Sequence, residues 1–588
     1  MLRLGMLAAF LMSVGVVWGQ MPDRTPNTRY PYVTDMDHEG AYVLRWGLNA
    51  THIWFEVQVK TLGYVGFGIS RDGRMVPADV IIGWVAGNQV HFQDYHTERY
   101  EAPTVDSSQD WLVDYGYEEA GWTVLGFTRA LDTCDTLGDF KITRDTQRLI
   151  YAYHTEDPDV TSPNPLIRHT VRGRKSVSLM TTSHPPAELP IDSSVIDFTN
   201  DNFSIPVANT STYNCRLFDL SDVNVKYHII KMSPVFSPGM EQYVDHMVLY
   251  RCRIADPASL LVNGASFNCF SDAPDHVQFC REHVASFGHR NKEDFYLPED
   301  VGIPIGGTGE SNLYVLATHY VNELQTPNLV DSSGIQLTYT ADLRTNDAAF
   351  LSMGNIISPN WLQYIPPGEP SFQQRAYCSE RCIQWGMNST QNALPMTVVG
   401  AKFHSHDLAT EMKLRHVTKT SSGAYVENPW LAYDGAFDSD QQAFRVAEKR
   451  RNVSFTDHLM LECTYDSSTR GFPTLGGWHP DNELCRAYVL YYPRKMLEGC
   501  MSWSNYDQLR NQIGQPVNGS DVFNTLLATD WSNNNVMRVN LKHALQNSIE
   551  NAQCWSSRQD PSYAVDWFQQ TDITIQTPYQ PTETRTCV

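Results

Sequence analysis

Residues 396–406 run Met-Thr-Val-Val-Gly-Ala-Lys-Phe-His-Ser-His. The β-branched and aromatic side chains are typical of a strand. Residues i and i+2 of a strand point to the same face, so His404 and His406 are expected to lie side by side. Two imidazoles on one face can bind the same ion, and imidazole suits several metals. The stretch therefore predicts a sheet with a candidate metal site at its end.

Similar runs recur along the chain and make the predicted fold mostly β. They occupy residues 41–46, 52–59, 80–85, 227–231, 246–252, 312–320 and 487–492. The strand-like runs up to residue 154 predict a β-sandwich of their own. Residues 156–190 contain six prolines among Ser, Thr and Arg, which predicts an extended linker without strands. One helix is expected near residues 541–552.

The N-terminus predicts a cleaved signal peptide, residues 1–19. Arg3 precedes the apolar stretch Leu4–Val17, and Val17-Trp18-Gly19 supplies a cleavage site. A membrane anchor is the alternative, but the apolar run is shorter than the ~20 residues that a spanning helix needs. The formal charge of -22 argues against nucleic acid as a partner. We therefore expect a secreted or lumenal protein without a membrane anchor.

All 12 cysteines follow the predicted signal peptide, and an even number in a secreted chain predicts disulfides. A zinc site beginning at Cys378-x-x-x-Cys382 is the alternative, although no second Cys or His pair follows at the usual distance. Spacing alone leaves the pairing open. Six Asn-x-Ser/Thr triplets predict N-glycosylation, at Asn49, Asn202, Asn209, Asn388, Asn452 and Asn518.

Motifs of other chemistries are absent from the sequence. It contains no Gly-x-Ser-x-Gly, no His-Glu-x-x-His, no phosphate-binding loop and no dinucleotide fingerprint. The even cysteine count argues against a free catalytic thiol. His246, which follows Asp245, and His319 each lie in a strand-like run. Taken alone, such a histidine is more often structural than a ligand.

Several segments in order resemble the copper type II, ascorbate-dependent monooxygenases of the dopamine β-hydroxylase family. They are Thr212–Cys215, His246–Cys252, Thr318–Tyr320, Ser332–Ile335, Ile365–Gly368, His404–His406, Gly476–Gly477 and Tyr491–Pro493. The resemblance covers most of the mature chain. Gly63–Gly68 and Ala78–Val80 resemble the DOMON domain of that family.

The resemblance implies a DOMON β-sandwich followed by two jelly-roll-like copper domains. The implied boundaries are 28–155 for the DOMON domain, 156–194 for the linker, 195–343 for the electron-transfer copper domain, 344–505 for the oxygen-binding copper domain and 506–588 for a C-terminal extension. It also implies six disulfides: Cys134–Cys587, Cys215–Cys269, Cys252–Cys280, Cys378–Cys500, Cys382–Cys554 and Cys463–Cys485.

The resemblance implies two copper ions per chain, with ascorbate as reductant and O2 as oxidant. One oxygen atom would enter a C–H bond of a small substrate, an amine being one possibility. The implied metal ligands are His246 and His319 at one copper, and His404 and His406 at the other. Tyr213, two residues before Cys215, occupies a place treated as functional in the family, so Tyr213 and His404 are the candidate catalytic residues.

Two expected ligands are replaced in this sequence. Asp245 stands where the family has the first histidine of a His-His pair, and Leu484 stands where it has the methionine before a cysteine. Leucine has no donor atom. Carboxylate is a harder donor that favours Cu(II) over Cu(I). His479, five residues before Leu484, is a candidate replacement ligand there, and Met240 and Met247 are candidates near the first site.

Three hypotheses follow. The first is a working hydroxylase with altered copper sites, and the second is a non-catalytic secreted relative. The third places the function in the DOMON-like domain as a ligand- or metal-binding module, with Asp72 and Asp79 as possible cation contacts. The substrate and the oligomeric state are left open.

Overall fold

A computed structural model describes the protein over residues 24–161, 166–180, 189–252, 263–274, 277, 280–288, 293–307, 312–357, 363–387, 394–505, 526–547, 550–556, 565–570 and 573–581. The described chain forms two compact units. The first unit contains the residues up to Lys141 together with Arg148–Lys175. The second contains Ile142–Gln147 and the described residues from Ser176 onward.

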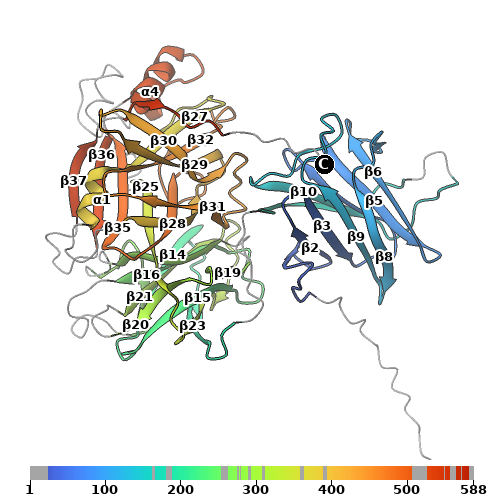
Figure 1. The fold of residues 1–588 in the computed structure, drawn as a ribbon, viewed down its shortest axis with the longest axis horizontal. Coiled ribbons are helices and arrows are strands. Elements are labelled where there is room, and N and C mark those ends of the chain that lie inside the picture. The colour runs from blue at the N-terminus through green and yellow to red at the C-terminus, as the bar shows by residue number, and fades with distance from the viewer. Residues whose placement is uncertain are drawn as a thin grey trace, which may run out of the picture. The chain divides into compact units, whose positions relative to one another are not determined.

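The first unit is a sandwich of two antiparallel sheets (Figure 1). One sheet has the order β1-β2-β3-β9-β8, with β1 (Tyr32–Asp35), β2 (Tyr42–Leu48), β3 (His52–Val59), β8 (Leu112–Glu119) and β9 (Trp122–Ala130). The other has the order β11-β10-β4-β5-β6-β7, with β4 (Val65–Ser70), β5 (Ala78–Ala86), β6 (Gln89–Thr97), β7 (Thr104–Val105), β10 (Gln147–Tyr153) and β11 (Val171–Val177).

Aromatic side chains fill the space between these two sheets. Phe55, Phe67 and Phe127 lie with ring centroids 5.2–5.8 Å apart, and Trp111 lies 5.6 Å from Phe127. All four side chains are buried. The predicted sandwich is present, but the expectation of a strand-free linker fails over Val171–Val177. This segment pairs with β10 as β11, because tertiary pairing overrides its weak strand pattern.

The second unit contains four larger sheets. The first half of the unit supplies two of them, with the orders β12-β23-β15-β20-β24 and β17-β14-β21-β16-β18. Their strands are β12 (Ser194–Thr199), β14 (Ser211–Asp219), β15 (Lys226–Val235), β16 (Val244–Cys252), β17 (Ser266–Asn268), β18 (Cys280–Gly288), β20 (Val301–Gly306), β21 (Leu313–Val321), β23 (Gly334–Thr340) and β24 (Asn346–Asp347).

The other two sheets have the orders β31-β28-β34-β25-β35-β36-β37 and β27-β32-β29-β30-β38. Their strands are β25 (Ala349–Asn355), β27 (Phe372–Cys378), β28 (Met396–His404), β29 (Ala409–Lys419), β30 (Tyr425–Asp434), β31 (Phe444–Val453), β32 (His458–Tyr465), β34 (Arg486–Tyr492), β35 (Leu497–Ser504), β36 (Glu550–Ser556), β37 (Val565–Gln570) and β38 (Ile575–Thr577).

One hydrophobic core joins the two halves of the second unit. It contains Leu249 and Leu316 from the first pair of sheets together with Val399, Tyr488 and Leu490 from the second pair. All five side chains are buried. Burial of apolar surface on this scale holds the strands that carry the histidines in fixed positions.

The predicted helix near residues 541–552 is only partly correct. Helix α4 spans Asn535–Asn547, and residues 550–552 begin strand β36 instead. The backbone of β36 pairs with β35 and β37, and that pairing decides the outcome over local helical propensity. A shorter helix, α1 (Glu380–Met387), follows β27. No helix in the described part of the chain is long and apolar enough to cross a membrane.

The structure contains five of the disulfides that the resemblance implies. They are Cys215–Cys269, Cys252–Cys280, Cys378–Cys500, Cys382–Cys554 and Cys463–Cys485. Cys378 and Cys382 each have a disulfide partner, which excludes the alternative of a zinc site there. Cys587 lies outside the described residues, and so does the pairing with Cys134. The predicted signal peptide, residues 1–19, also lies outside them.

Candidate metal centres

The candidate histidines form two sites: the first contains His246 and His319, and the second contains His404 and His406. The second histidine site lies at the end of β28. The strand ends at His404, so the expectation that both histidines belong to one strand is wrong. The chain turns after His404, and the imidazole rings lie at 89° with centroids 5.8 Å apart. The rings still lie close to each other, as the His-x-His spacing predicts.

Each imidazole of this site is held through its Nδ1 atom. His404 Nδ1 bonds to Gln442 Oε1, and His406 Nδ1 lies 2.8 Å from the Asn482 carbonyl oxygen. Both acceptors are carbonyl oxygens, so each ring donates from Nδ1 and keeps its Nε2 lone pair free. His406 Nε2 is buried and has no hydrogen-bond partner. Metal-binding histidines are held in this way, and the free Nε2 atom fits a ligand.

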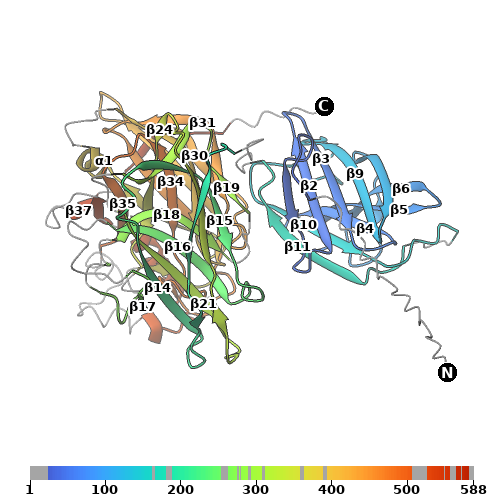
Figure 2. The ribbon, with the colours of Figure 1, turned by 90° about the horizontal axis from the view of Figure 1, so that it is seen from below.

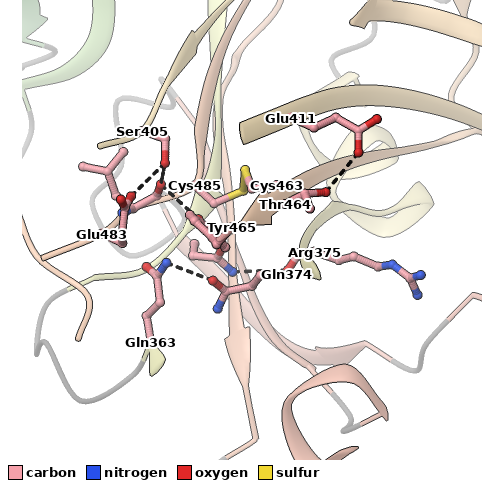
Figure 3. Close-up of a disulfide and its surroundings, with 12 residues drawn as sticks. Gln363, Gln374, Arg375, Ser405, Glu411, Cys463, Thr464, Tyr465, Glu483 and Cys485 are labelled. Carbon is pink, nitrogen blue, oxygen red and sulfur yellow. Dashed lines mark hydrogen bonds between the residues drawn. A yellow bond between two sulfur atoms is a disulfide. The ribbon is translucent and has the colours of Figure 1, made fainter. Parts of the chain in front are cut away.

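Glu483 fixes the backbone that follows His404. Figure 3 shows its carboxylate beside Ser405, whose Oγ donates to it at 2.9 Å. The carboxylate also accepts hydrogen bonds from the His406 N–H at 3.0 Å and from the Leu408 N–H at 2.6 Å. Burial raises the pKa of Glu483, and these hydrogen bonds act in the opposite direction. The Cys463–Cys485 disulfide lies beside this carboxylate and anchors the same segment.

Leu484 provides no ligand to this site. Its side chain is fully buried, and its carbonyl oxygen accepts a hydrogen bond from Tyr465 Oη at 3.1 Å. The candidate replacement at this site, His479, has a side chain that is 41% exposed beside Asp481. Met240 and Met247, the candidates for the first site, are buried in the hydrophobic core. The second site therefore offers two imidazoles.

The first histidine site combines Asp245, His246 and His319. His246 and His319 are register partners on β16 and β21, and His319 is also the partner of Tyr213 on β14. The three rings form a row across the sheet, with centroids 4.1 Å apart for Tyr213–His319 and 5.0 Å for His246–His319. The register shifts between Val244 and His246, which leaves Asp245 as an extra residue. Such a bulge re-aims side chains, so Asp245 and His246 face the same site.

Asp245 accepts hydrogen bonds from both histidines. Its Oδ2 atom lies 2.7 Å from His246 Nδ1 and 2.9 Å from His319 Nδ1. One ligand atom from each of the three residues lies within 4.8 Å of the others. Burial would raise the pKa of Asp245, but the two histidines outweigh it and hold the pKa well below its usual value. A carboxylate with two imidazoles is a donor set that fits Cu(II).

Burial also keeps His319 and His404 neutral. It lowers the pKa of His319 to about 4, although the hydrogen bond to Asp245 acts in the opposite direction. Burial and the nearby His246 and His406 lower the pKa of His404 well below its usual value. Neutral imidazole is the form that binds metal ions, so each site has one histidine, His319 or His404, in the required state at neutral pH.

The two sites lie next to each other in the second unit. The rings of His246 and His404 have centroids 5.6 Å apart. Tyr213 Oη donates to the Trp478 carbonyl oxygen at 3.3 Å, and the Trp478 ring lies 6.4 Å from His246. Side chains from β14, β16 and β28 therefore form one continuous polar centre.

Several residues of this centre carry no signal in the sequence. Gln442, Trp478, Asn482 and Glu483 contact the histidines or hold their backbone. None belongs to a metal-binding motif, and each comes close only through the pairing of distant strands. Their distance from His404 along the sequence does not indicate that they lie near it in the structure.

The first unit contains a second acidic group. Asp79, Asp94 and Asp139 each place one carboxylate oxygen within 4.8 Å of the others. Asp79 is already paired with Arg129, and Trp111 Nε1 donates to it at 2.7 Å. The ion pair with Arg129 thus explains the burial of the Asp79 carboxylate without a bound cation. Asp72 lies on an exposed loop, where it accepts a hydrogen bond from the Arg74 N–H.

Four of the six predicted glycosylation sites lie within the described residues. Asn49, Asn202, Asn209 and Asn452 are exposed. Exposure is required for a glycan, and glycosylation itself stays a prediction. Asn388 and Asn518 lie outside the described residues.

The chain matches three families of domains. Residues 38–154 match the DOMON domain, residues 196–327 match the N-terminal domain of copper type II ascorbate-dependent monooxygenases, and residues 346–513 match the C-terminal domain. A DOMON sandwich joined to paired β domains that bear histidines defines the class of the DOMON-containing copper monooxygenases. The chain belongs to the copper type II ascorbate-dependent monooxygenase family.

Two relatives show how far the similarity extends. The chain is 34% identical over 494 residues to DBH-like monooxygenase protein 1 of Homo sapiens, covering 83% of this chain and 78% of that protein. It is 31% identical over 504 residues to dopamine beta-hydroxylase of Rattus norvegicus, covering 84% and 77%. The predicted family and the mostly β fold with DOMON and copper domains are confirmed.

Proposed function

We propose that this protein is a copper- and ascorbate-dependent hydroxylase that inserts one oxygen atom of O2 into a C–H bond of a small substrate. Asp245, His246 and His319 would hold one copper ion, and His404 and His406 the other. The buried, unpartnered Nε2 atom of His406 is the observation that carries the proposal. A buried polar atom without a partner is costly unless a ligand satisfies it.

Bound copper would supply the one-electron redox chemistry that lets ascorbate reduce the centre and O2 react there. The chain contributes the geometry. Gln442 and the Asn482 carbonyl fix the tautomers of His404 and His406. Tyr213 stacks on His319 at 4.1 Å and contacts the Trp478 carbonyl, so it orients the first site against the second. Imidazole binds both Cu(I) and Cu(II), as is required of a ligand whose ion cycles between these two oxidation states.

The compartment and the substrate belong to the same proposal. Five disulfides in the described chain support an oxidising environment, in agreement with the predicted signal peptide. We propose secretion or residence in the lumen of the secretory pathway. The family suggests a small substrate, for which an amine is the first class to test.

A second candidate function is a secreted relative without catalysis. The hydrogen bonds from His246 and His319 to Asp245 favour it, because they satisfy the first site without metal. The fully buried Leu484 also favours it, because a thioether that would stabilise Cu(I) is missing.

Copper content and ascorbate-driven O2 uptake separate the two candidates. Two copper ions per chain, both reduced by ascorbate, with O2 uptake on a substrate panel would support the hydroxylase. Retention of one ion or none would support the non-catalytic relative. The double variant Asp245→His, Leu484→Met, which restores both family ligands, should then gain copper and O2 uptake. If this variant also stays inactive, the loss lies elsewhere in the chain.

A further inference from the structure

The first histidine site includes a serine that lies on the far side of the His319 ring from Asp245. Ser211 lies on β14, His319 on β21 and Asp245 on β16, and these three strands are neighbours in one sheet of the second unit (Figure 2). Ser211 Oγ lies 2.8 Å from His319 Nε2, and His319 Nδ1 lies 2.9 Å from Asp245 Oδ2. The two nitrogens of one imidazole thus join a hydroxyl group to a carboxylate.

One tautomer of neutral His319 satisfies both of these contacts. A carboxylate only accepts hydrogen bonds, so His319 Nδ1 donates its N–H to Asp245. Nε2 then carries the lone pair and accepts a hydrogen bond from the Ser211 hydroxyl group. A serine beside a base that a third group orients is the arrangement that activates a serine nucleophile. Both distances lie within the range of about 2.6–3.2 Å that such an arrangement requires.

The surrounding side chains hold the base and leave the serine accessible. His319 is completely buried, and the Tyr213 ring stacks on it with centroids 4.1 Å apart. Asp245 is held by a second hydrogen bond, because its Oδ2 atom also lies 2.7 Å from His246 Nδ1. Ser211 is only partly buried, as a nucleophile that has to meet a substrate must be. A base and an orienting carboxylate that are fixed before the substrate arrives favour the reaction.

The surroundings of Ser211 favour an aromatic ester as the substrate. Tyr213 lies two residues from Ser211, so both side chains point to the same face of β14. Phe270 packs edge-on against Tyr213 with centroids 4.9 Å apart, and Phe270 is 65% exposed. An exposed ring next to the nucleophile offers an apolar surface to an aromatic group. An aryl ester also has a good leaving group, so it needs less stabilisation by the protein than an amide does.

We propose that Ser211, His319 and Asp245 form a hydrolytic triad, with which the metal-free protein cleaves aromatic carboxylic esters. Ser211 Oγ attacks the ester carbonyl carbon and forms a new C–O bond, while its proton passes to His319 Nε2. The bond to the leaving alcohol then breaks, and the alcohol takes this proton. A water molecule next attacks the acyl carbon and gives a proton to His319 Nε2. The acid leaves as Ser211 Oγ takes that proton back, and Asp245 stays ionised throughout.

This activity goes beyond the proposed hydroxylase and depends on the residue at position 245. A histidine there, as the family has, would leave His319 without its carboxylate partner. The hydrogen bond from His319 to Asp245 requires a proton on Nδ1, and a metal ion held between these two residues would replace that proton. Copper loading is therefore expected to abolish ester cleavage.

The test uses the full-length protein in EDTA with two probes, 4-nitrophenyl acetate and a fluorophosphonate. We expect turnover of the ester and a fluorophosphonate adduct that peptide mass spectrometry locates on Ser211. Asp245→Asn should slow formation of the adduct by at least about a hundredfold, because the imidazole is no longer held in the required tautomer. Asp245→His should slow it to the same extent.

Ser211 is also the third residue of the glycosylation triplet that begins at Asn209, so two variants separate these roles. Ser211→Ala removes both the hydroxyl group and the triplet, and it should lose ester turnover and the adduct. Asn209→Gln removes only the triplet and should keep both. Ser194→Ala, which changes an exposed serine of β12, is a further control that should keep both. Far-ultraviolet circular dichroism checks that each variant folds.

Two results would overturn the proposal. One is a metal-free wild-type protein that gives neither ester turnover nor an adduct. In that case a lower copper affinity of Ser211→Ala would show that Ser211 only orients His319. The other is an adduct that forms at the wild-type rate in Asp245→Asn. Copper content and O2 uptake report separately on the hydroxylase, so failure of one proposal leaves the other testable.

Discussion

The imidazole rings of His246 and His404 lie 5.6 Å apart although they belong to different sheets. His246 lies in β16, next to β21, while His404 ends β28 in the seven-stranded sheet. The shared core that includes Leu249 and Leu490 fixes this distance. The two histidine sites therefore belong to one centre.

Leu484→Met is expected to strengthen Cu(I) binding at the second histidine site. Leucine and methionine have similar volumes, so the exchange should cost less than about 1.5 kcal/mol of folding free energy. The thioether adds a soft donor that favours Cu(I). We expect at least a tenfold gain in Cu(I) affinity, measured by competition with a chromogenic chelator, and a sulfur neighbour in X-ray absorption.

Leu490→Met is the matched control, because Leu490 is equally buried on β34. It should leave Cu(I) affinity unchanged. Absence of a sulfur neighbour in the Leu484→Met protein would show that residue 484 does not reach the ion.

Gln442→Leu is expected to weaken copper at the second site without unfolding the protein. Gln442 Oε1 is the acceptor that holds His404 Nδ1. Loss of such a supporting partner typically costs ~10–100-fold in metal affinity. Chelator competition measures the affinity, and the thermal midpoint reports on folding. Gln384→Leu, on the exposed face of α1, serves as the control. Equal copper affinities in both variants would remove Gln442 from the site.

Glu483→Gln is expected to destabilise the second unit and the His404–His406 turn together. Both carboxylate oxygens accept hydrogen bonds, from Leu408 N–H on one side and from Ser405 and His406 on the other. An amide group would direct N–H against one of these donors, at a cost of about 1–3 kcal/mol. Calorimetry should show a lower midpoint for the second unit.

Glu411→Gln provides the comparison, because Glu411 accepts hydrogen bonds from the Tyr433 and Thr464 hydroxyl groups but is less buried. The midpoint of thermal unfolding of the Glu411→Gln variant should change little. A Glu483→Gln midpoint equal to that of the wild type would mean that the hydrogen bonds of Glu483 add no stability.

Asp94→Asn is expected to reduce the pH dependence of stability of the first unit. Burial raises the pKa of Asp94 from 3.8 to about 8, and the nearby Asp79 and Asp139 act in the same direction. Between these two pH values the folded state holds a proton that the unfolded state has released. The stability that Asp94 contributes is therefore complete below pH 3.8 and is lost as pH rises towards 8.

Asparagine has no such proton to lose. We expect the thermal midpoint of the first unit to rise by a few degrees at pH 8, for a gain on the order of 1–3 kcal/mol, and to change little at pH 4. Calorimetry in the presence of EDTA measures it. The exposed Asp72→Asn serves as the control. A parallel pH profile for Asp94→Asn and wild type would contradict the prediction.

The sequence by itself determined the strand content and the family. Alternation of apolar and polar residues is local, so β2, β3, β5 and β28 follow from short runs. The order of the motifs along the chain predicted His404, His406, His246 and His319 as candidate ligands. The same resemblance predicted Asp245 and Leu484 as departures from the family pattern.

Only the tertiary structure decided how these residues meet. Pairing between strands that are distant in sequence creates the bulge that turns Asp245 towards His319. It also brings the carbonyl acceptors to His404 and His406. Strand β11 forms for the same reason, against its linker-like composition. Local patterns set which segments become strands, while long-range pairing and burial set their neighbours.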